Sequence, residues 1–457
     1  MRSLKVFVVP VLAGAIVAAA ATLPRPVAEA RTPGSVTVRQ TLYACPTADG
    51  NAVATGRVAA HAGARVVALA LPGKEPINAL TPVDAWNETK VDANATVVGT
   101  EDAKGAGAVG FFGGIAAGAD GGGFAVGACP GVNQGSWFVG AGSGDRHFST
   151  MTLTNLTASP AIADLSLWGE EGSVDAVDAE GIVLKGFQTR RITLDSLAAG
   201  EPELAMRVNS RRGALSVAVQ DTSTAIFRGT ETLTPTSAPA RRQVISGIAA
   251  GATGRQLVAV NPGGQTARVK INALGKDGSF VPTGLDDVKV PAGKVEVIDL
   301  PKSLGGDPVA LRLTADHPLS ASVRVAPSNK DFEYAVAGPP LAGPAVAPLS
   351  LGGLVQDAKL LLTAPGAKAK AKVTAFDSSM AEQGSADFDL KAGSTQSFDL
   401  AKEGEFDKPL ADLAYVVVTP TGDVQGAVLY TRGSGVSAVP LTAAPLKTVA
   451  PQVQPGR

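Results

Sequence analysis

The sequence has few of the side chains that enzymes most often use for catalysis. Three histidines and two cysteines occur in 457 residues, and aromatic residues make up 5% of the chain. His61, His147 and His317 lie far apart, and none has a second histidine at a metal-binding spacing. We therefore expect no metal and no cofactor. Ser143, Asp145 and His147 could be drawn as a triad, but neighbours on one loop rarely converge in that way.

The chain also lacks an excess of charge of either sign. Its 40 Lys and Arg residues balance 41 Asp and Glu residues, and charged residues make up only 18% of the chain. Basic clusters are short, such as Arg190-Arg191, Arg241-Arg242 and residues 368–372. A nucleic-acid-binding surface needs a basic face or stripe, so we expect no nucleic-acid partner.

One common catalytic motif is absent from the sequence, and one nucleotide-binding motif occurs without the structural context that it needs. No G-x-S-x-G nucleophile elbow occurs. Residues 105–110 match G-x-G-x-x-G, but a Phe-Phe-Gly-Gly stretch follows instead of a helix, so we interpret the segment as a loop. Three pairs of carboxylates are candidates for glycoside hydrolysis, but only because they have the residue type that this reaction uses. These pairs are Glu170 with Glu171, Asp286 with Asp287, and Glu403 with Glu405.

What the chain does have begins with an export signal. Arg2 and Lys5 precede an apolar run over residues 6–23, and an Ala-Glu-Ala tripeptide ends at Ala30. This pattern is typical of a secretory signal peptide. We predict that residues 1–30 are cleaved and that the mature protein is extracellular. An uncleaved anchor is the alternative, because the run approaches the ~20 residues that a spanning helix needs. We expect no membrane span after cleavage.

The two cysteines occupy the same tripeptide, Ala-Cys-Pro, at Cys45 and Cys129. An even number of cysteines in an exported chain favours a disulfide. A Cys45–Cys129 bridge would close a loop of about 84 residues, for which the chain-entropy model gives roughly 4–5 kcal/mol. A redox or metal pair is the weaker alternative, because the C-x-x-C spacing is absent.

Similar segments recur about every 100 residues after the second cysteine. The segments that match are 151–156, 257–262 and 359–365, then 163–168, 268–273 and 371–376, and finally 215–220, 319–325 and 424–430. Each is a short run of alternating apolar and polar residues bounded by Gly, Pro, Asp or Asn, which predicts a half-buried strand. Seven or so such strands per 100 residues are typical of a β-sandwich. A propeller fits less well, because its blades usually span about 40–50 residues.

We therefore predict an all-β fold of tandem immunoglobulin-like β-sandwich repeats. The predicted units are a signal peptide (residues 1–30), a divergent N-terminal β unit (35–130), three repeats (131–235, 241–338 and 344–440) and a Pro-rich tail (441–457). In the divergent unit, Trp86, Phe111 and Phe112 are the expected large core residues.

Several motifs together carry a resemblance to a known family. The export signal is followed by two Ala-Cys-Pro tripeptides, by Trp-Phe-Val-Gly at residues 137–140, and by Asn-Pro and Asp-Gly turns at 261–262 and 277–278. This combination resembles a family of secreted actinobacterial proteins known only as a domain of unknown function. The resemblance implies a high-GC, Gram-positive source and a place in or near the cell envelope. It brings no catalytic residues.

From these observations we expect a non-catalytic secreted scaffold or binding protein associated with the cell envelope. Its expected partner is cell-wall glycan or another envelope or secreted protein. A secreted hydrolase acting on envelope polysaccharide through carboxylates is one alternative. A glycan-binding module is another, with exposed Trp137 and Trp168 as possible glycan contacts.

Overall fold

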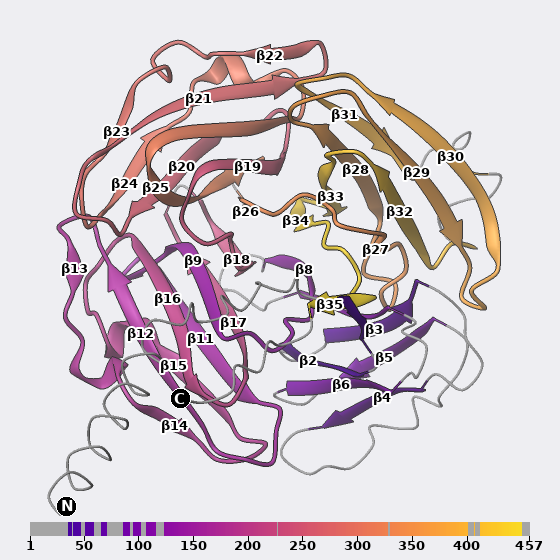
Figure 1. Cartoon of the computed structure of the whole chain (residues 1–457), viewed down its shortest axis with the longest axis horizontal. Helices are drawn as coiled ribbons and strands as arrows, with labels where there is room; N and C mark the ends of the chain where they lie inside the picture. Colours follow the sequence, from indigo (N-terminus) through magenta and orange to yellow (C-terminus); the bar gives the residue numbers. More distant parts are fainter. Residues whose placement is uncertain are drawn as a thin grey trace, which may run out of the picture. The chain divides into compact units, whose positions relative to one another are not determined.

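The fold is all-β, as predicted (Figure 1). The computed structural model describes residues 35–38, 40–46, 51–58, 65–70, 86–91, 95–101, 107–115, 123–225, 227–327, 330–400, 406 and 412–449. The helices described are three short 3-10 turns: η1 (Val177–Ala179), η2 (Leu194–Ser196) and η3 (Lys302–Gly305). Among the described residues, no helix has the length and apolar character needed to cross a membrane.

The strands of the first half form two groups, each with two antiparallel sheets. In the first group, one sheet contains β2 (Gln40–Pro46), β6 (Ala95–Glu101) and β4 (Arg65–Ala70). The other sheet contains β5 (Asn87–Val91), β3 (Asn51–Arg57), β7 (Ala108–Ile115) and β8 (Phe124–Ala128). In the second group, one sheet contains β9 (Gly135–Ala141), β16 (Leu204–Arg212), β12 (Ala161–Trp168), β13 (Ser173–Val174) and β14 (Ile182–Leu184). The other sheet contains β10 (Ser143–Gly144), β11 (His147–Asn155), β15 (Thr189–Thr193), β17 (Leu215–Ser223) and β18 (Gly229–Leu233).

The strands of the second half form two further groups. The third contains β19 (Ala240–Ile248), β21 (Ala267–Gly275), β22 (Gly278–Phe280), β23 (Val288–Val290), β20 (Gly254–Asn261), β24 (Lys294–Asp299), β26 (Glu333–Val336) and the long β25 (Val309–Ala326), which joins both of its layers. In the fourth group, one sheet contains β27 (Ala345–Pro348), β32 (Tyr415–Thr421), β29 (Ala369–Phe376) and β30 (Glu382–Leu390). The other sheet contains β31 (Ser394–Asp399), β28 (Asp357–Ala364), β33 (Gln425–Arg432) and β34 (Gly435–Pro440).

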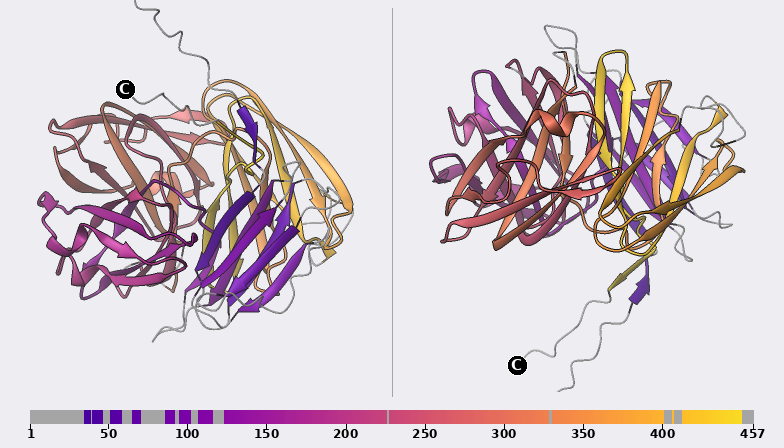
Figure 2. Two further views of the ribbon diagram at one scale, coloured as in Figure 1. Left: turned by 60° about the horizontal axis from the view of Figure 1, so that its bottom comes forward. Right: turned by 90° about the horizontal axis from the view of Figure 1, so that it is seen from above.

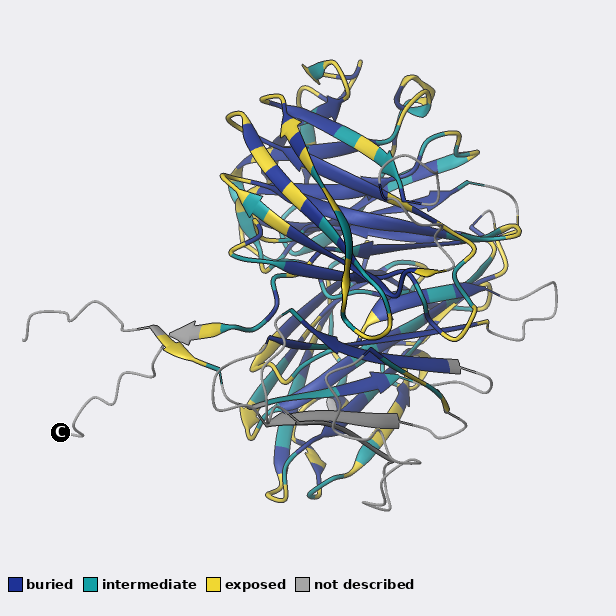
Figure 3. Cartoon of the chain, turned by 90° about the vertical axis from the view of Figure 1, so that its right-hand side faces the viewer, coloured by how far each residue is buried: buried dark blue, intermediate teal, exposed yellow. Residues whose placement is uncertain are grey.

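The same order of strand pairing recurs in all four groups. One sheet of each group runs β5-β3-β7-β8, β15-β11-β17-β18, β24-β20-β25-β26 or β31-β28-β33-β34. In β21 and β29, which belong to other sheets, buried and exposed residues alternate, as Figure 3 shows in dark blue and yellow, because successive side chains point to opposite faces. The recurrence is compatible with tandem immunoglobulin-like repeats, and the predicted domain boundaries stay a prediction.

A buried asparagine closes the same turn in the second and third groups. The amide nitrogen of Asn155 donates to the carbonyls of Ser159 (2.8 Å) and Lys185 (3.0 Å). Asn261 donates in the same way to Gln265 (2.7 Å) and Val290 (3.0 Å). Since a buried polar side chain is costly without partners, each asparagine ties the end of one strand to a segment about 30 residues further along the chain.

The four groups share their hydrophobic cores. The core of the second group includes Phe332 and Tyr334 from the third, and the core of the third includes Leu429 and Ala438 from the fourth. The core of the fourth includes Phe124 from the first. Figure 2 shows the purple strands of the first group beside the yellow strands of the fourth. Residues Thr37–Leu446 accordingly form one compact unit.

The N-terminal and C-terminal strands form a small sheet of their own. β1 (Ser35–Thr37) pairs with β35 (Lys447–Val449). Within the large unit, the amide of Val38 donates to the carbonyl of Leu446 at 3.0 Å. The two ends of the large unit are therefore joined by a backbone hydrogen bond.

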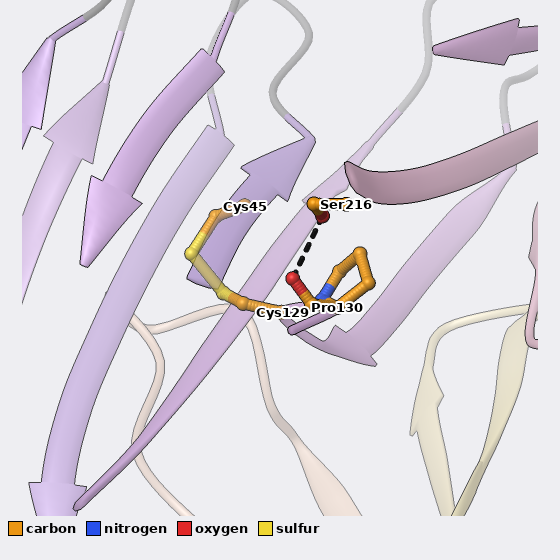
Figure 4. Close-up of a disulfide and its surroundings, with 4 residues drawn as sticks. All are labelled: Cys45, Cys129, Pro130 and Ser216. Carbon is orange, nitrogen blue, oxygen red and sulfur yellow. Dashed lines mark hydrogen bonds between the residues drawn. A yellow bond between two sulfur atoms is a disulfide. The ribbon is translucent and has the colours of Figure 1, made fainter. Parts of the chain in front are cut away.

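The predicted disulfide is present and lies between β2 and the end of β8. Cys45 and Cys129 are bonded, and both are buried (Figure 4). The carbonyl of Pro130 accepts the amide of Ala44 at 3.1 Å and the hydroxyl of Ser216, in the second group, at 2.8 Å. The bridge thus fixes a segment that connects the first two groups.

Candidate functional site

One strand from each group lies at the centre of the large unit. β8, β18, β26 and β34, here called the inner strands, contact one another in a closed cycle (Figure 1). Glycine at two positions permits this approach. A Cβ on Gly123 would lie 1.8 Å from the carbonyl oxygen of Thr230, and a Cβ on Gly435 would lie 2.4 Å from the Cβ of Phe124. The inner strands therefore meet through their backbones.

Asp331 holds three of these strands together at the end where they begin. Its carboxylate accepts the backbone amides of Phe124 (3.2 Å), Val436 (3.0 Å) and Phe332 (3.0 Å). Burial raises the pKa of Asp331 to about 7, although the three amides act in the opposite direction. A single side chain thus contacts the first, third and fourth groups.

Two further carboxyl groups are buried beside Asp331. Burial is the main cause that raises the pKa of Glu333 to about 8, and it raises the pKa of Glu231 well above its usual range. The negative charge of Asp331 adds to both shifts. The amide of Ala249 donates to Glu333 at 3.3 Å, and the amide of Thr232 donates to Glu231 at 2.6 Å. Both carboxyls are therefore neutral over most of the physiological pH range.

The second polar cluster surrounds His147, at the contact between the second and third groups. Its Nε2 lies 3.0 Å from a carboxylate oxygen of Asp221, and its Nδ1 lies 2.7 Å from the carbonyl of Pro202. Both ring nitrogens therefore face acceptors and donate to them, which requires the imidazolium form. Burial alone would lower the pKa of His147, but the carboxylates of Asp221 and Glu203 outweigh it and raise the pKa.

Ser143, Asp145 and His147 do not form a triad. Ser143 donates to the backbone carbonyl of Ala198, and the partner of His147 is Asp221, not Asp145. Asp221 also accepts hydrogen bonds from Ser149 and from Tyr334, the latter at 2.7 Å. A histidine acting as general base needs a free ring nitrogen facing a nucleophile. Because both nitrogens of His147 already donate, this cluster is a structural network.

A pocket of about 340 Å³ opens where the inner strands end. Its wall contains the segments that follow each inner strand: Cys129–Gly131, Thr234–Ser237, Ala337–Pro339 and Leu441–Ala443. Each of these segments contains or adjoins a proline. We call this site the four-strand pocket. Its volume lies within the range of roughly 300–1,000 Å³ that is typical of small-molecule sites.

The wall of the four-strand pocket carries no Asp, Glu, His, Lys or Arg among the described residues. Its one titratable side chain is Tyr43, and burial raises the pKa of that phenol to about 12. The Tyr43 hydroxyl donates to the carbonyl of Ala108 at 2.9 Å. The pocket is therefore uncharged at neutral pH, and most of its surface is apolar.

A family model matches residues 86–401, which is more than half of the chain. The matching model is described as a family of unknown function, DUF5719. The chain belongs to this family. No curated protein matches the sequence. The resemblance to a domain of unknown function is thus confirmed, while secretion and an actinobacterial source stay predictions.

The residues that the DUF5719 model matches include the His147 cluster and the buried acids Asp331 and Glu333. They do not include every wall of the pocket. His147, Asp331 and Glu333 lie within residues 86–401, whereas Cys45 and β34 lie outside them. The family description assigns no activity. Any function must therefore be argued from the geometry of this chain.

In this DUF5719 member, the two tryptophans considered as glycan contacts lie between the second and third groups. Trp137 on β9 and Trp168 on β12 stack with ring centroids 5.2 Å apart. They pack against Val258, Val260 and Val295 of the third group. Trp137 is 9% exposed and Trp168 is half-buried. The glycan-contact prediction required an exposed ring, which Trp137 does not offer.

The other candidates from the sequence do not form a common site. Glu170 and Glu171 are exposed in a turn, and Glu171 lies 3.4 Å from the Nζ of Lys294. Asp287 is paired with Arg268. His61 and the third carboxylate pair, residues 403 and 405, lie outside the described residues. Among the described residues, no group of three or more potential ligands could hold a metal ion.

The G-x-G-x-x-G match continues into a strand instead of a helix. Ala108, Val109 and Gly110 belong to β7, while residues 105 and 106 lie outside the described part of the chain. The helix amides that would hold a pyrophosphate are therefore missing from the described end of the motif.

The sequence did contain a signal for the buried polar groups that the pattern analysis missed. Arg324 stands between two valines on β25, and Glu333 is followed by Tyr, Ala and Val on β26. An ionisable residue at such a position is usually paired or has a shifted pKa. Arg324 is hydrogen-bonded to Glu203 of the second group, and Glu333 accepts the amide of Ala249 at 3.3 Å. These partners lie far from Arg324 and Glu333 in the sequence, so they could not be assigned from it.

Proposed function

We propose that this chain is an exported, non-catalytic binding protein that acts at the cell envelope and holds its ligand in the four-strand pocket. The observation that carries the proposal is the wall of that pocket, to which all four groups contribute and which offers no acid or base for catalysis. Binding in a concave, mostly apolar site with a few polar groups is typical of small-molecule recognition.

Two features of the sequence support action outside the cytoplasm. Residues 1–30 have the pattern of a signal peptide. The bond between Cys45 and Cys129 is of a kind that persists in oxidising compartments. Envelope glycan or another envelope or secreted protein would present the ligand.

The experiment is co-sedimentation of purified protein with envelope fragments that keep both wall glycan and lipid. We expect the protein to pellet with the fragments in low and high salt, because an uncharged pocket does not depend on ion pairs. Thr234→Trp fills the pocket and should release the protein into the supernatant. Thr374→Trp is the matched control, since Thr374 is also half-buried but lies on β29 away from the pocket.

The same incubations separate this proposal from its alternatives. Release of soluble reducing ends would support a hydrolase and contradict a non-catalytic role. Pelleting that soluble wall oligosaccharides abolish in both variants would support glycan binding elsewhere on the surface. If wild-type protein stays in the supernatant, the envelope role is wrong.

A further inference from the structure

The wall of the four-strand pocket restricts the charge of any occupant. A charged group that enters a low-dielectric site without a partner loses several kcal/mol of hydration. The described wall has no ionised side chain to compensate for this loss. A carboxylate, phosphate or ammonium group would therefore be rejected from the pocket, whatever the rest of the ligand contains.

The composition of the wall also indicates the shape and polarity of the ligand. Val109, Ala128 and Pro130 supply accessible apolar surface, and prolines follow three of the four inner strands closely. Thr232 and Thr234 line the pocket and are half-buried. In the described part of the chain, no hydrogen bond occupies the hydroxyl of Thr234. The site thus offers an apolar surface with a hydroxyl donor and acceptor.

We infer that the four-strand pocket binds an uncharged ligand with an apolar, mainly aliphatic body and one hydroxyl or carbonyl group, such as a long-chain alcohol or its ester. The aliphatic wall gains free energy by covering the body of the ligand. Thr234 hydrogen-bonds to its polar group. This inference rests on the proposed binding function and specifies the ligand class of the same site.

The first experiment uses Nile red, an uncharged dye that becomes fluorescent in apolar surroundings. We expect a saturable increase in fluorescence with the wild-type protein. Thr234→Trp, in the segment after β18, and Ala218→Phe, on β17, each place a ring in the pocket and should weaken binding by about tenfold or more. Thr374→Trp should bind the dye as the wild type does. Circular dichroism checks that each variant keeps its strands.

The second experiment compares decanol with decanoate as competitors, at a pH where the acid is ionised. The two molecules have the same aliphatic chain and differ in the charge of one end. Decanol should displace Nile red, and decanoate should need about tenfold or higher concentration, because its carboxylate finds no partner. This comparison uses only wild-type protein, so it decides the question even if neither pocket variant folds.

The outcomes distinguish the ligand class from the binding function. If decanoate competes as well as decanol, or if the Thr374 variant loses as much dye as the pocket variants, the ligand class is wrong. The envelope role would still stand if the protein pellets with fragments. If the wild type binds no Nile red and no decanol, the inference is also overturned, whatever the pelleting result.

Discussion

At the scale of single residues, this protein buries ionisable groups at the places where its groups of strands meet. His147 donates from both ring nitrogens, to Asp221 and to the Pro202 carbonyl. Asp331 accepts three backbone amides. Asp331 is thus bound to three groups of strands, and Asp221, the partner of His147, accepts a hydrogen bond from Tyr334 of the third group. The protonation of these side chains is therefore linked to folding of the whole unit.

Glu333 gives a prediction for pH dependence. Its folded pKa of about 8 lies above that of an unfolded glutamate, so the folded state binds the extra proton. The stability that this proton brings is complete below the unfolded pKa of about 4.5, falls steadily as the pH rises above that value, and is lost once the pH passes about 8. Asp331, with a pKa of about 7, and His147, whose pKa is raised, act in the same direction. The protein should be more stable in mild acid than in mild alkali.

The test is Glu333→Gln, measured by urea unfolding at mildly acidic and mildly alkaline pH. The amide cannot ionise, so the variant should lose on the order of 3 kcal/mol less stability between the two conditions than the wild type. Glu382→Gln on the exposed face of β30 is the control and should unfold as the wild type does. Equal pH dependence in the wild type and Glu333→Gln would contradict the prediction.

At the scale of elements, the disulfide and the Pro130 carbonyl fix the end of an inner strand. Cys129 follows β8, and Pro130 accepts hydrogen bonds from the first and second groups. The same segment forms one wall of the four-strand pocket. The bridge therefore supports both folding and the shape of the pocket.

Replacing both cysteines, Cys45→Ser with Cys129→Ser, should lower the free energy of unfolding by about 2–5 kcal/mol, because the unfolded chain gains conformational freedom. Ser216→Ala removes one hydrogen bond to the same segment and should cost only about 1 kcal/mol. Chemical denaturation measures both. A double serine variant as stable as Ser216→Ala would show that the bridge contributes little.

At the scale of the whole molecule, the four groups of strands complete one another's cores. Phe124, Tyr334 and Ala438 each lie in the core of a neighbouring group. A group separated from the others would expose this apolar surface to water. The large unit is therefore expected to unfold as one cooperative body and not as independent domains.

We predict a single thermal unfolding transition that calorimetry and fluorescence report at the same temperature. Asp331→Ala leaves two or more buried amides without an acceptor and should lower that transition without splitting it. The predicted domain boundaries allow independent domains, which would instead give several unfolding transitions. In that case Asp331→Ala would lower only some of the transitions. Separate transitions in the wild type would contradict the shared-core description.

The strand class, the recurrence and the disulfide could all be predicted from the sequence alone. Alternation with period two and turn residues at regular spacing are local properties, so they predict strands wherever they occur. The pairing of Cys45 with Cys129 followed because the chain has no other cysteine.

The way in which the groups of strands meet, and the side chains that lie between them, follow from long-range contacts. Asp221 is 74 residues from His147 and Ser437 is 311 residues from Val126, yet each pair is hydrogen-bonded. Trp137 faces another group of strands rather than solvent for the same reason. Such contacts depend on the arrangement of complete sheets, which no local pattern encodes, and the four-strand pocket exists only because all four groups converge.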